Sequence, residues 1–174
     1  MDTLNLDLND DSLKGTQNRV AKMYVKEIYN GLNPANKPEA RAYNNNYGYS
    51  DVLMEKNVHV SLFCEHHFLP FIGKAHIAYI SEGKVIGLSK INRLVDYYSR
   101  RPQVQERLTL QIADAISDAM NTEDVTVYIA SKYLYVSMRG IKDHTSSTIN
   151  SEFRGAFKKK DIQLKFIDFI RTPS

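Results

Sequence analysis

The chain has 174 residues, of which 43% are apolar and 25% charged, and its formal net charge is +3. This composition fits one globular domain with a hydrophobic core, and the modest charge suits a polyanionic small ligand better than a nucleic acid. One cysteine, Cys64, excludes an intrachain disulfide, and no apolar N-terminal stretch resembles a signal peptide or a membrane span. We therefore expect a cytoplasmic protein without nucleic-acid or membrane partners.

The first half of the chain predicts one helix and three strands. Residues 1–16 are rich in aspartate and are expected to form a flexible segment before a single domain over 17–174. Apolar spacing predicts a helix over 18–29, whereas prolines and asparagines predict a long surface loop over 31–50. Alternating residues predict strands over 57–63, 72–81 and 84–89, the last two joined by a hairpin turn at Glu82-Gly83.

The second half alternates helices and strands. A helix is expected over 91–98, with Ser89 as its N-cap, and Arg101-Pro102 ends it because the residue before proline avoids the helical conformation. A longer helix is predicted over 104–119, strands over 125–130, 133–139 and 151–157, and a final helix over 162–170. This order predicts an α+β fold with an antiparallel sheet and helices on one face.

The tetrapeptide Cys64-Glu65-His66-His67 is a candidate metal site. Cys-x-x-His at the end of a strand offers a thiolate and an imidazole close enough to share one ion, while the absence of other cysteines excludes a four-sulfur site. Taken alone, the pattern also fits a buried thiol beside hydrogen-bonded histidines.

Three longer segments resemble the GTP cyclohydrolase I family: CEHHFLPFIGKAHIAYI, VIGLSKINRLVDYYSRRPQVQERLTLQIADAI and MRGIKDHTSSTI. The resemblance implies a tunnelling fold, in which four-stranded antiparallel sheets backed by helices join into an oligomeric barrel. Two pentamers would stack into a homodecamer with active sites at subunit interfaces. The implied enzyme opens the guanine ring of GTP, releases formate and forms 7,8-dihydroneopterin triphosphate.

The resemblance also implies substrate-binding residues. Glu106 matches the family's guanine anchor, because a carboxylate accepts two parallel hydrogen bonds from the guanine edge, and Gln105 is expected to assist. Without the resemblance, both residues fit the solvated face of a helix.

Cations near a helix start match the triphosphate site. Ser89, Lys90 and Arg93 combine backbone N–H groups, a helix dipole and two positive charges. Arg139 resembles a further triphosphate contact, and Arg19 another, although the segment TQNR lacks the proline of the family's Thr-Pro-x-Arg motif. Each residue alone would be an ordinary surface residue.

The implied zinc site is altered in this chain. Cys64 and His67 match two family ligands, and His66 keeps one catalytic histidine position, but Tyr135 stands at the third ligand and Tyr133 at the other catalytic histidine. On a strand, residues 133 and 135 would face the same side. A phenol is bulkier than a thiol and ionises at higher pH, so we expect zinc to be weakly bound or absent.

Three hypotheses follow. The first is a GTP cyclohydrolase I-type enzyme with a rebuilt or weakened metal site, in which His59, His76 or His144 is a candidate substitute ligand. The second is an enzyme with changed purine or pterin chemistry, using Cys64 as a nucleophile or the tyrosines as proton donors. The third is a diverged homologue that only binds a guanine nucleotide or pterin, or that serves as a scaffold beside an active homologue.

Overall fold

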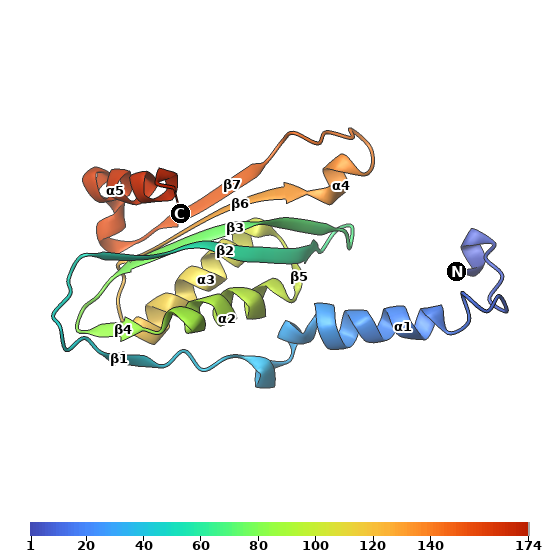
Figure 1. The fold of residues 1–174 in the computed structure, drawn as a ribbon, viewed down its shortest axis with the longest axis horizontal. Coiled ribbons are helices and arrows are strands. Elements are labelled where there is room, and N and C mark those ends of the chain that lie inside the picture. Colours follow the sequence, from blue (N-terminus) through green and yellow to red (C-terminus); the bar gives the residue numbers. More distant parts are fainter. Residues whose placement is uncertain (174) are drawn as a thin grey trace.

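A computed structural model describes residues 1–173, and a twisted sheet lies at its centre (Figure 1). The strand order is β5-β2-β3-β6-β7. The four long strands are antiparallel to their neighbours: β2 (Val52–Cys64), β3 (Pro70–Ile80), β6 (Val125–Tyr133) and β7 (Thr148–Phe153). The short β5 (Pro102–Gln103) runs parallel to the end of β2. The prediction of an α+β fold with an antiparallel sheet is therefore confirmed.

Two helices cover one face of the sheet. They are α2 (Leu88–Ser99) and α3 (Gln105–Met120), and both lie below the sheet in Figure 1. Every second residue of the strands points at them, so that Val60, Leu62, Ile77 and Tyr79 are almost fully buried. The main core lies between these residues and the apolar stripes of the helices, and it places the start of α3 beside the end of β2.

The last helix, α5 (Lys160–Arg171), packs on the other face of the sheet, above it in Figure 1. Its Phe166 meets Phe157 of the turn η5 (Gly155–Lys158) in a small second core that also contains Val52 and Ala78. The prediction of helices on one face therefore holds for α2 and α3, whereas α5 packs on one end of the opposite face.

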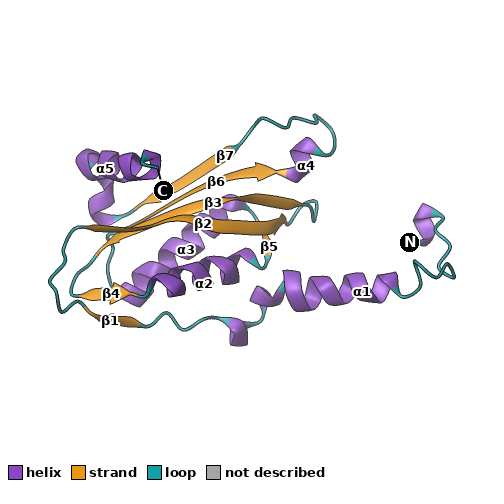
Figure 2. Cartoon of the chain, in the orientation of Figure 1, coloured by secondary structure: helices purple, strands orange, loops and turns teal. Residues whose placement is uncertain are grey.

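The N-terminal helix extends away from the sheet (Figure 2). It begins as α1 (Thr16–Met23) and continues as the π-helical turn η2 (Tyr24–Ile28). Tyr24 and Tyr29 make edge-on ring contacts with Phe63 and Phe68, with centroids between 5.8 and 6.4 Å apart. These contacts hold the base of the helix against the turn that follows β2.

The predicted hairpin at Glu82-Gly83 is wrong. The strand β4 (Lys84–Ile86) pairs with β1 (Ala42–Asn44), which lies inside the expected surface loop, and β3 has no part in that pairing. Asn45, just after β1, is joined to the segment before β4: its side chain donates to Ser81 Oγ at 3.0 Å, and its backbone N–H donates to the carbonyl of Gly83.

The predicted strand over 133–139 is also wrong beyond its first residue. Tyr133 forms the last pair of β6, opposite Phe71, and no neighbouring strand continues further. The chain therefore closes into the single turn α4 (Leu134–Ser137), and β7 begins three residues earlier than expected.

Ser89 is not the N-cap of α2. Gly87 occupies that position in an extended conformation, and Ser89 lies within the first helical turn. Within residues 1–173, no helix combines the length and the apolar character that crossing a membrane requires.

Candidate active site

The end of β2 and the turn after it carry the Cys-Glu-His-His motif. The turn is closed by hydrogen bonds between Cys64 and Leu69 and between Phe68 and Cys64, and Phe68 adopts a left-handed backbone conformation (φ 51°). Cys64 is 3% exposed, and its Sγ lies 3.6 Å from Nδ1 of His66 and 3.9 Å from Nδ1 of His67. The motif therefore gathers one buried thiol and two exposed imidazoles in a single turn.

The two tyrosines lie next to each other, although only Tyr133 belongs to a strand. Their ring centroids are 5.2 Å apart. Tyr133 stacks on Phe71 at 4.5 Å and donates its hydroxyl hydrogen to Oε1 of Gln105 at 3.1 Å. Tyr135 stacks on the imidazole of His67 at 4.7 Å. The two phenols therefore lie side by side next to His67, although Tyr135 belongs to the turn α4 and not to the strand that the sequence predicted.

The charge of Glu106, the expected guanine anchor, acts on the pKa of both tyrosines. Burial raises the pKa of Tyr133, and the charges of Glu106, Tyr135 and Cys64 raise it further. Burial, Cys64 and Glu106 raise the pKa of Tyr135 in the same direction. Glu106 is therefore close enough to both phenols to act on them, and the phenols stay neutral at pH 7.

Gln105 and Glu106 are adjacent in the first turn of α3 but have different surroundings. Gln105 is fully buried, and its Nε2 donates to the carbonyls of Ile129 and Thr148, both at 3.1 Å. Because its Oε1 accepts from Tyr133, the amide is engaged within the chain. Glu106 is exposed and leaves its carboxylate available for a ligand.

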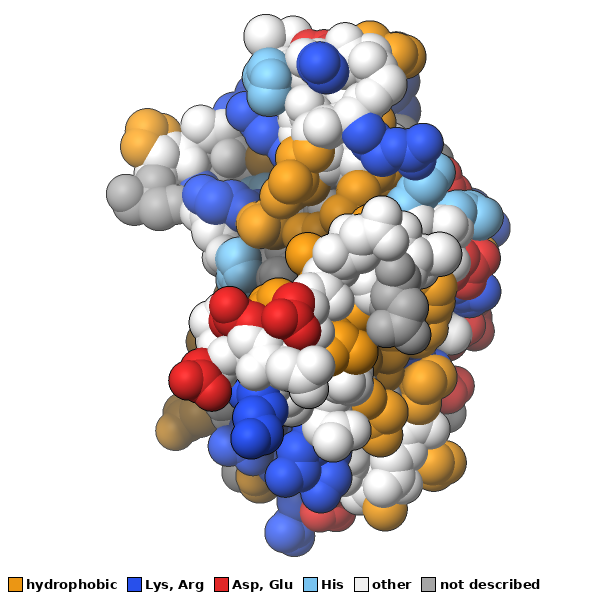
Figure 3. Space-filling model, turned by 90° about the vertical axis from the view of Figure 1, so that its right-hand side faces the viewer, with side chains coloured by type: hydrophobic (Ala, Val, Ile, Leu, Met, Phe, Trp, Pro, Cys, Tyr) orange, Lys and Arg blue, Asp and Glu red, His pale blue; other side chains and the backbone are white. Residues whose placement is uncertain are grey.

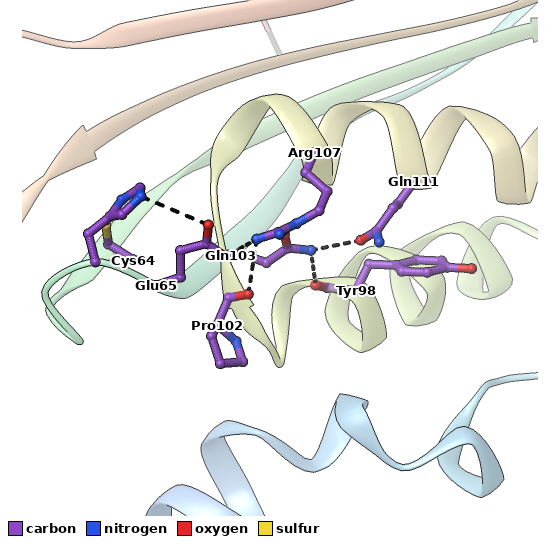
Figure 4. A network of polar contacts seen from close by, with 8 residues as sticks. Cys64, Glu65, Tyr98, Pro102, Gln103, Arg107 and Gln111 are labelled. Carbon is purple, nitrogen blue, oxygen red and sulfur yellow. Dashed lines mark hydrogen bonds and ion pairs between the residues drawn. The ribbon is translucent and has the colours of Figure 1, made fainter.

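A network that the sequence analysis missed supports the histidine turn (Figure 4). Glu65 forms an ion pair with Arg107 and lies 3.9 Å from Nε2 of His66. Arg107 also donates to Oε1 of the buried Gln103 at 2.8 Å, and Gln103 donates to Gln111 at 2.8 Å. The only sequence signal was the helical spacing of residues 103, 107 and 111, since nothing local pairs Glu65 with α3.

The expected phosphate-binding residues of α2 lie in the first half of that helix, which begins at the opposite end of the sheet from the end of β2 (Figure 1). They are Ser89, Lys90 and Arg93. Asn92, on the same helix, donates to Glu55 at 3.1 Å. Glu55 therefore marks where this helix meets β2, nine residues before Cys64. A strand of that length spans about 30 Å, so one chain does not bring these residues to the histidine turn.

The other two expected phosphate contacts differ in their availability. Arg139 is exposed just after α4, at the same end of the sheet as Tyr135. Figure 3 views this end, where basic, histidine and hydrophobic side chains are exposed beside one another. The guanidinium of Arg19 instead donates to the carbonyls of Ser12 and Lys14 and to Thr16 Oγ1, all within its own N-terminal segment.

The residues present do not fit the three-ligand zinc site that the resemblance implies. Cys64 and His67 offer two donors, whereas Tyr135 offers a neutral phenol stacked on His67. Two of the three candidate substitutes lie elsewhere. His59 is an odd number of residues from Cys64 on β2, so its side chain points to the other face of the strand. His76 is buried in the middle of the sheet beside Tyr128. Residues 1–173 contain no group of three His, Cys, Asp or Glu side chains able to hold a metal ion.

Comparison with known proteins agrees with the resemblance. A family model described as GTP cyclohydrolase I matches residues 1–171. A protein named GTP cyclohydrolase 1 from Flavobacterium johnsoniae is 58% identical over 171 residues, covering 98% of this chain and 77% of its own length. Proteins of the same name from Wigglesworthia glossinidia brevipalpis and Aeromonas hydrophila are 49% and 46% identical over 168 residues, covering 96% of this chain and 78% and 77% of their own lengths. This chain therefore belongs to the GTP cyclohydrolase I family.

Proposed function

We propose that this chain is a GTP cyclohydrolase I-type hydrolase, which binds GTP and opens its guanine ring to give formate and 7,8-dihydroneopterin triphosphate. Family membership and identity above 45% to proteins named GTP cyclohydrolase 1 support the activity. The structural observation that carries the proposal is the shared neighbourhood of Glu106, Cys64 and the two tyrosines at one end of the sheet.

Each residue has a distinct role in this proposal. The exposed carboxylate of Glu106 accepts two hydrogen bonds from the edge of the guanine, which orients the ring toward the histidine turn. His66, exposed beside Cys64, transfers a proton to or from the opening ring. Gln105 acts indirectly, because its amide holds the phenol of Tyr133 in place.

The triphosphate site is completed by a second copy of the chain. Arg139 lies at the same end of the sheet as Glu106, whereas the helix that carries Ser89, Lys90 and Arg93 contacts β2 at Glu55, about 30 Å along the strand from Cys64. A site that uses both groups is assembled between neighbouring copies, consistent with a homo-oligomer of two stacked pentamers. Positive side chains from both copies then neutralise the phosphates.

A second candidate function is a diverged homologue that binds a guanine nucleotide or pterin, or performs other purine chemistry, with little or no cyclohydrolase activity. The two tyrosines favour it, since they stand at one expected zinc ligand and one expected catalytic histidine. The family generally depends on zinc, and these two positions offer neutral phenols in its place.

Turnover separates the two candidates. The purified oligomer is incubated with GTP and added zinc salt, while formate release and pterin fluorescence are followed. We expect both products from the wild type and their loss in Glu106→Gln, which keeps the shape of the side chain but removes its charge. Asp118→Asn, an exposed acid on the same helix, is the matched control and should keep full turnover.

Tight GTP binding without either product would favour the second candidate. Absence of both binding and turnover would contradict the proposed function in either form.

A further inference from the structure

Four aromatic rings form a continuous row along the site wall. Phe71 stacks on Tyr133 with centroids 4.5 Å apart and planes 11° apart, and Tyr133 meets Tyr135 edge-on at 5.2 Å. Tyr135 stacks on the imidazole of His67 at 4.7 Å and 26°. This aromatic row runs from the buried start of β3 to the exposed histidine turn and includes both substituted positions.

The row is fixed at its inner end. Phe71 is fully buried, and the hydroxyl of Tyr133 bonds to Gln105, whose amide donates to two backbone carbonyls of β6 and β7. Tyr135 packs against the main core through its ring. Moving either ring aside would break a stacking contact, and moving Tyr133 would also leave the buried Gln105 Oε1 without its donor.

Two metal donors are nevertheless well placed. Typical Zn–S and Zn–N bonds in a tetrahedral site hold their two donor atoms about 3.5 Å apart. The distance from Cys64 Sγ to His67 Nδ1 is 3.9 Å, which is close to that spacing. What the site lacks is a third donor, because Tyr135, whose ring stacks on the face of His67, offers only a neutral phenol there.

We propose that the residues present do not form a stable three-ligand zinc centre: Cys64 and His67 provide two donors, the neutral phenol of Tyr135 does not supply the third, and zinc is therefore bound only weakly and reversibly. The inference rests on the proposed function for assigning these two residues as ligands. Guanine and triphosphate recognition use Glu106 and the cations, so GTP binding does not depend on zinc.

Zinc binding by the isolated oligomer tests this proposal. Wild type and variants are loaded with zinc chloride under a non-thiol reductant, dialysed against zinc-free buffer and analysed for metal. We expect wild type to retain less than about a tenth of an equivalent per chain, because catalytic zinc sites use three protein ligands. Tyr135→Cys supplies the third donor and should retain close to one equivalent, with an affinity for zinc at least about 100-fold higher in a chelator competition.

Further variants separate the roles of the phenol and the thiol. Tyr135→Phe keeps the ring and removes the oxygen, so its zinc content should equal that of wild type. Cys64→Ala should abolish the residual weak binding, whereas the matched change His59→Ala, at an exposed histidine on the other face of β2, should not alter it.

Three outcomes of the zinc measurements would overturn the inference: a full equivalent of zinc retained by wild type, loss of zinc binding in Tyr135→Phe, or an unchanged affinity in Tyr135→Cys despite native secondary structure. GTP binding is measured on the same samples with and without a chelator. If zinc binding behaves as expected and GTP does not bind, the proposed function fails while the inference stands. If GTP binding requires zinc, the inference fails.

Discussion

Arg107 joins the histidine turn to α3 through two different partners. Its guanidinium pairs with Glu65 at the surface and donates to the fully buried Gln103. An ion pair at the surface contributes little to the free energy of unfolding, whereas leaving a buried amide oxygen without a donor lowers it more strongly. The buried hydrogen bond is therefore the larger contribution of Arg107 to stability.

Arg107→Ala is expected to lower the free energy of unfolding by about 1–3 kcal/mol, because Gln103 Oε1 loses its donor. Urea unfolding followed by circular dichroism measures the change. Arg171→Ala removes an arginine from a largely exposed contact with Asp168 and should change the stability by less than about 0.5 kcal/mol. Equal effects of the two substitutions would show that the buried bond contributes nothing.

His76 makes the stability sensitive to acid. It is 6% exposed, and burial, followed by the charges of Lys56 and Lys74, lowers its pKa below the ordinary 6.5. Above pH 6.5 the ring is neutral in both the folded and the unfolded chain. As the pH falls, the unfolded chain binds the proton first, so stability is lost until the folded pKa has been passed.

Substituting His76 should therefore flatten one part of the pH profile. Between about pH 7.5 and 5.5, wild type is expected to lose more unfolding free energy than His76→Gln, because only wild type gains this proton on unfolding. Urea midpoints at the two pH values give the difference. His144→Gln, at an exposed histidine, should behave as wild type. An identical pH dependence in His76→Gln would refute the assignment.

At the scale of elements, β3 and β6 approach each other closely at Gly73. A Cβ atom there would lie 2.1 Å from the carbonyl oxygen of Ala130 and 2.4 Å from Ser131 Oγ. Gly73 pairs directly with Ser131, so a side chain would push the two central strands apart. These strands present Phe71 and Tyr133 to the site, which makes their spacing important for the aromatic row.

Gly73→Ala is expected to lower the free energy of unfolding by about 1–3 kcal/mol through overpacking. Thermal unfolding at matched concentration is the measurement. Gly87→Ala is the control, because Gly87 has φ −64° and the nearest atom to its added Cβ is a flexible lysine carbon at 3.7 Å. If Gly73→Ala were as stable as Gly87→Ala, the close approach of the strands would be wrong.

The sequence predicted elements well where a local pattern decides the structure. The helix over 104–119 follows the apolar stripe of α3, which needs no knowledge of its neighbours. The strand over 133–139 failed because its alternation continues past the point where β3 and β7 cease to offer partners. The hairpin at residues 82 and 83 failed because β1, a distant segment, pairs with β4.

The site shows the same division between local and distant information. Cys64, His66 and His67 form one turn, so their grouping follows from the sequence. The engagement of Gln105 by β6 and β7, and of Arg107 by Glu65, depends on contacts between segments far apart in the chain. The sequence therefore identified the candidate residues but not which of them the fold keeps available for a ligand.

At the scale of the whole molecule, the candidate GTP site is divided. Glu106 and Arg139 lie at one end of the sheet, and Ser89 and Lys90 lie at the other. The proposed GTP site therefore uses residues from more than one chain. The central claim of the proposed function is that GTP binds only where neighbouring copies assemble.

Mixing two defective variants tests that claim most directly. Glu106→Ala removes the guanine anchor and Lys90→Ala removes a phosphate contact, so each homo-oligomer should bind GTP at least about tenfold more weakly than wild type. After joint unfolding and refolding, equilibrium dialysis should show wild-type affinity at about a quarter of the sites, since random assembly pairs two intact halves that often. Mixed oligomers that bind no better than either parent would contradict the shared site.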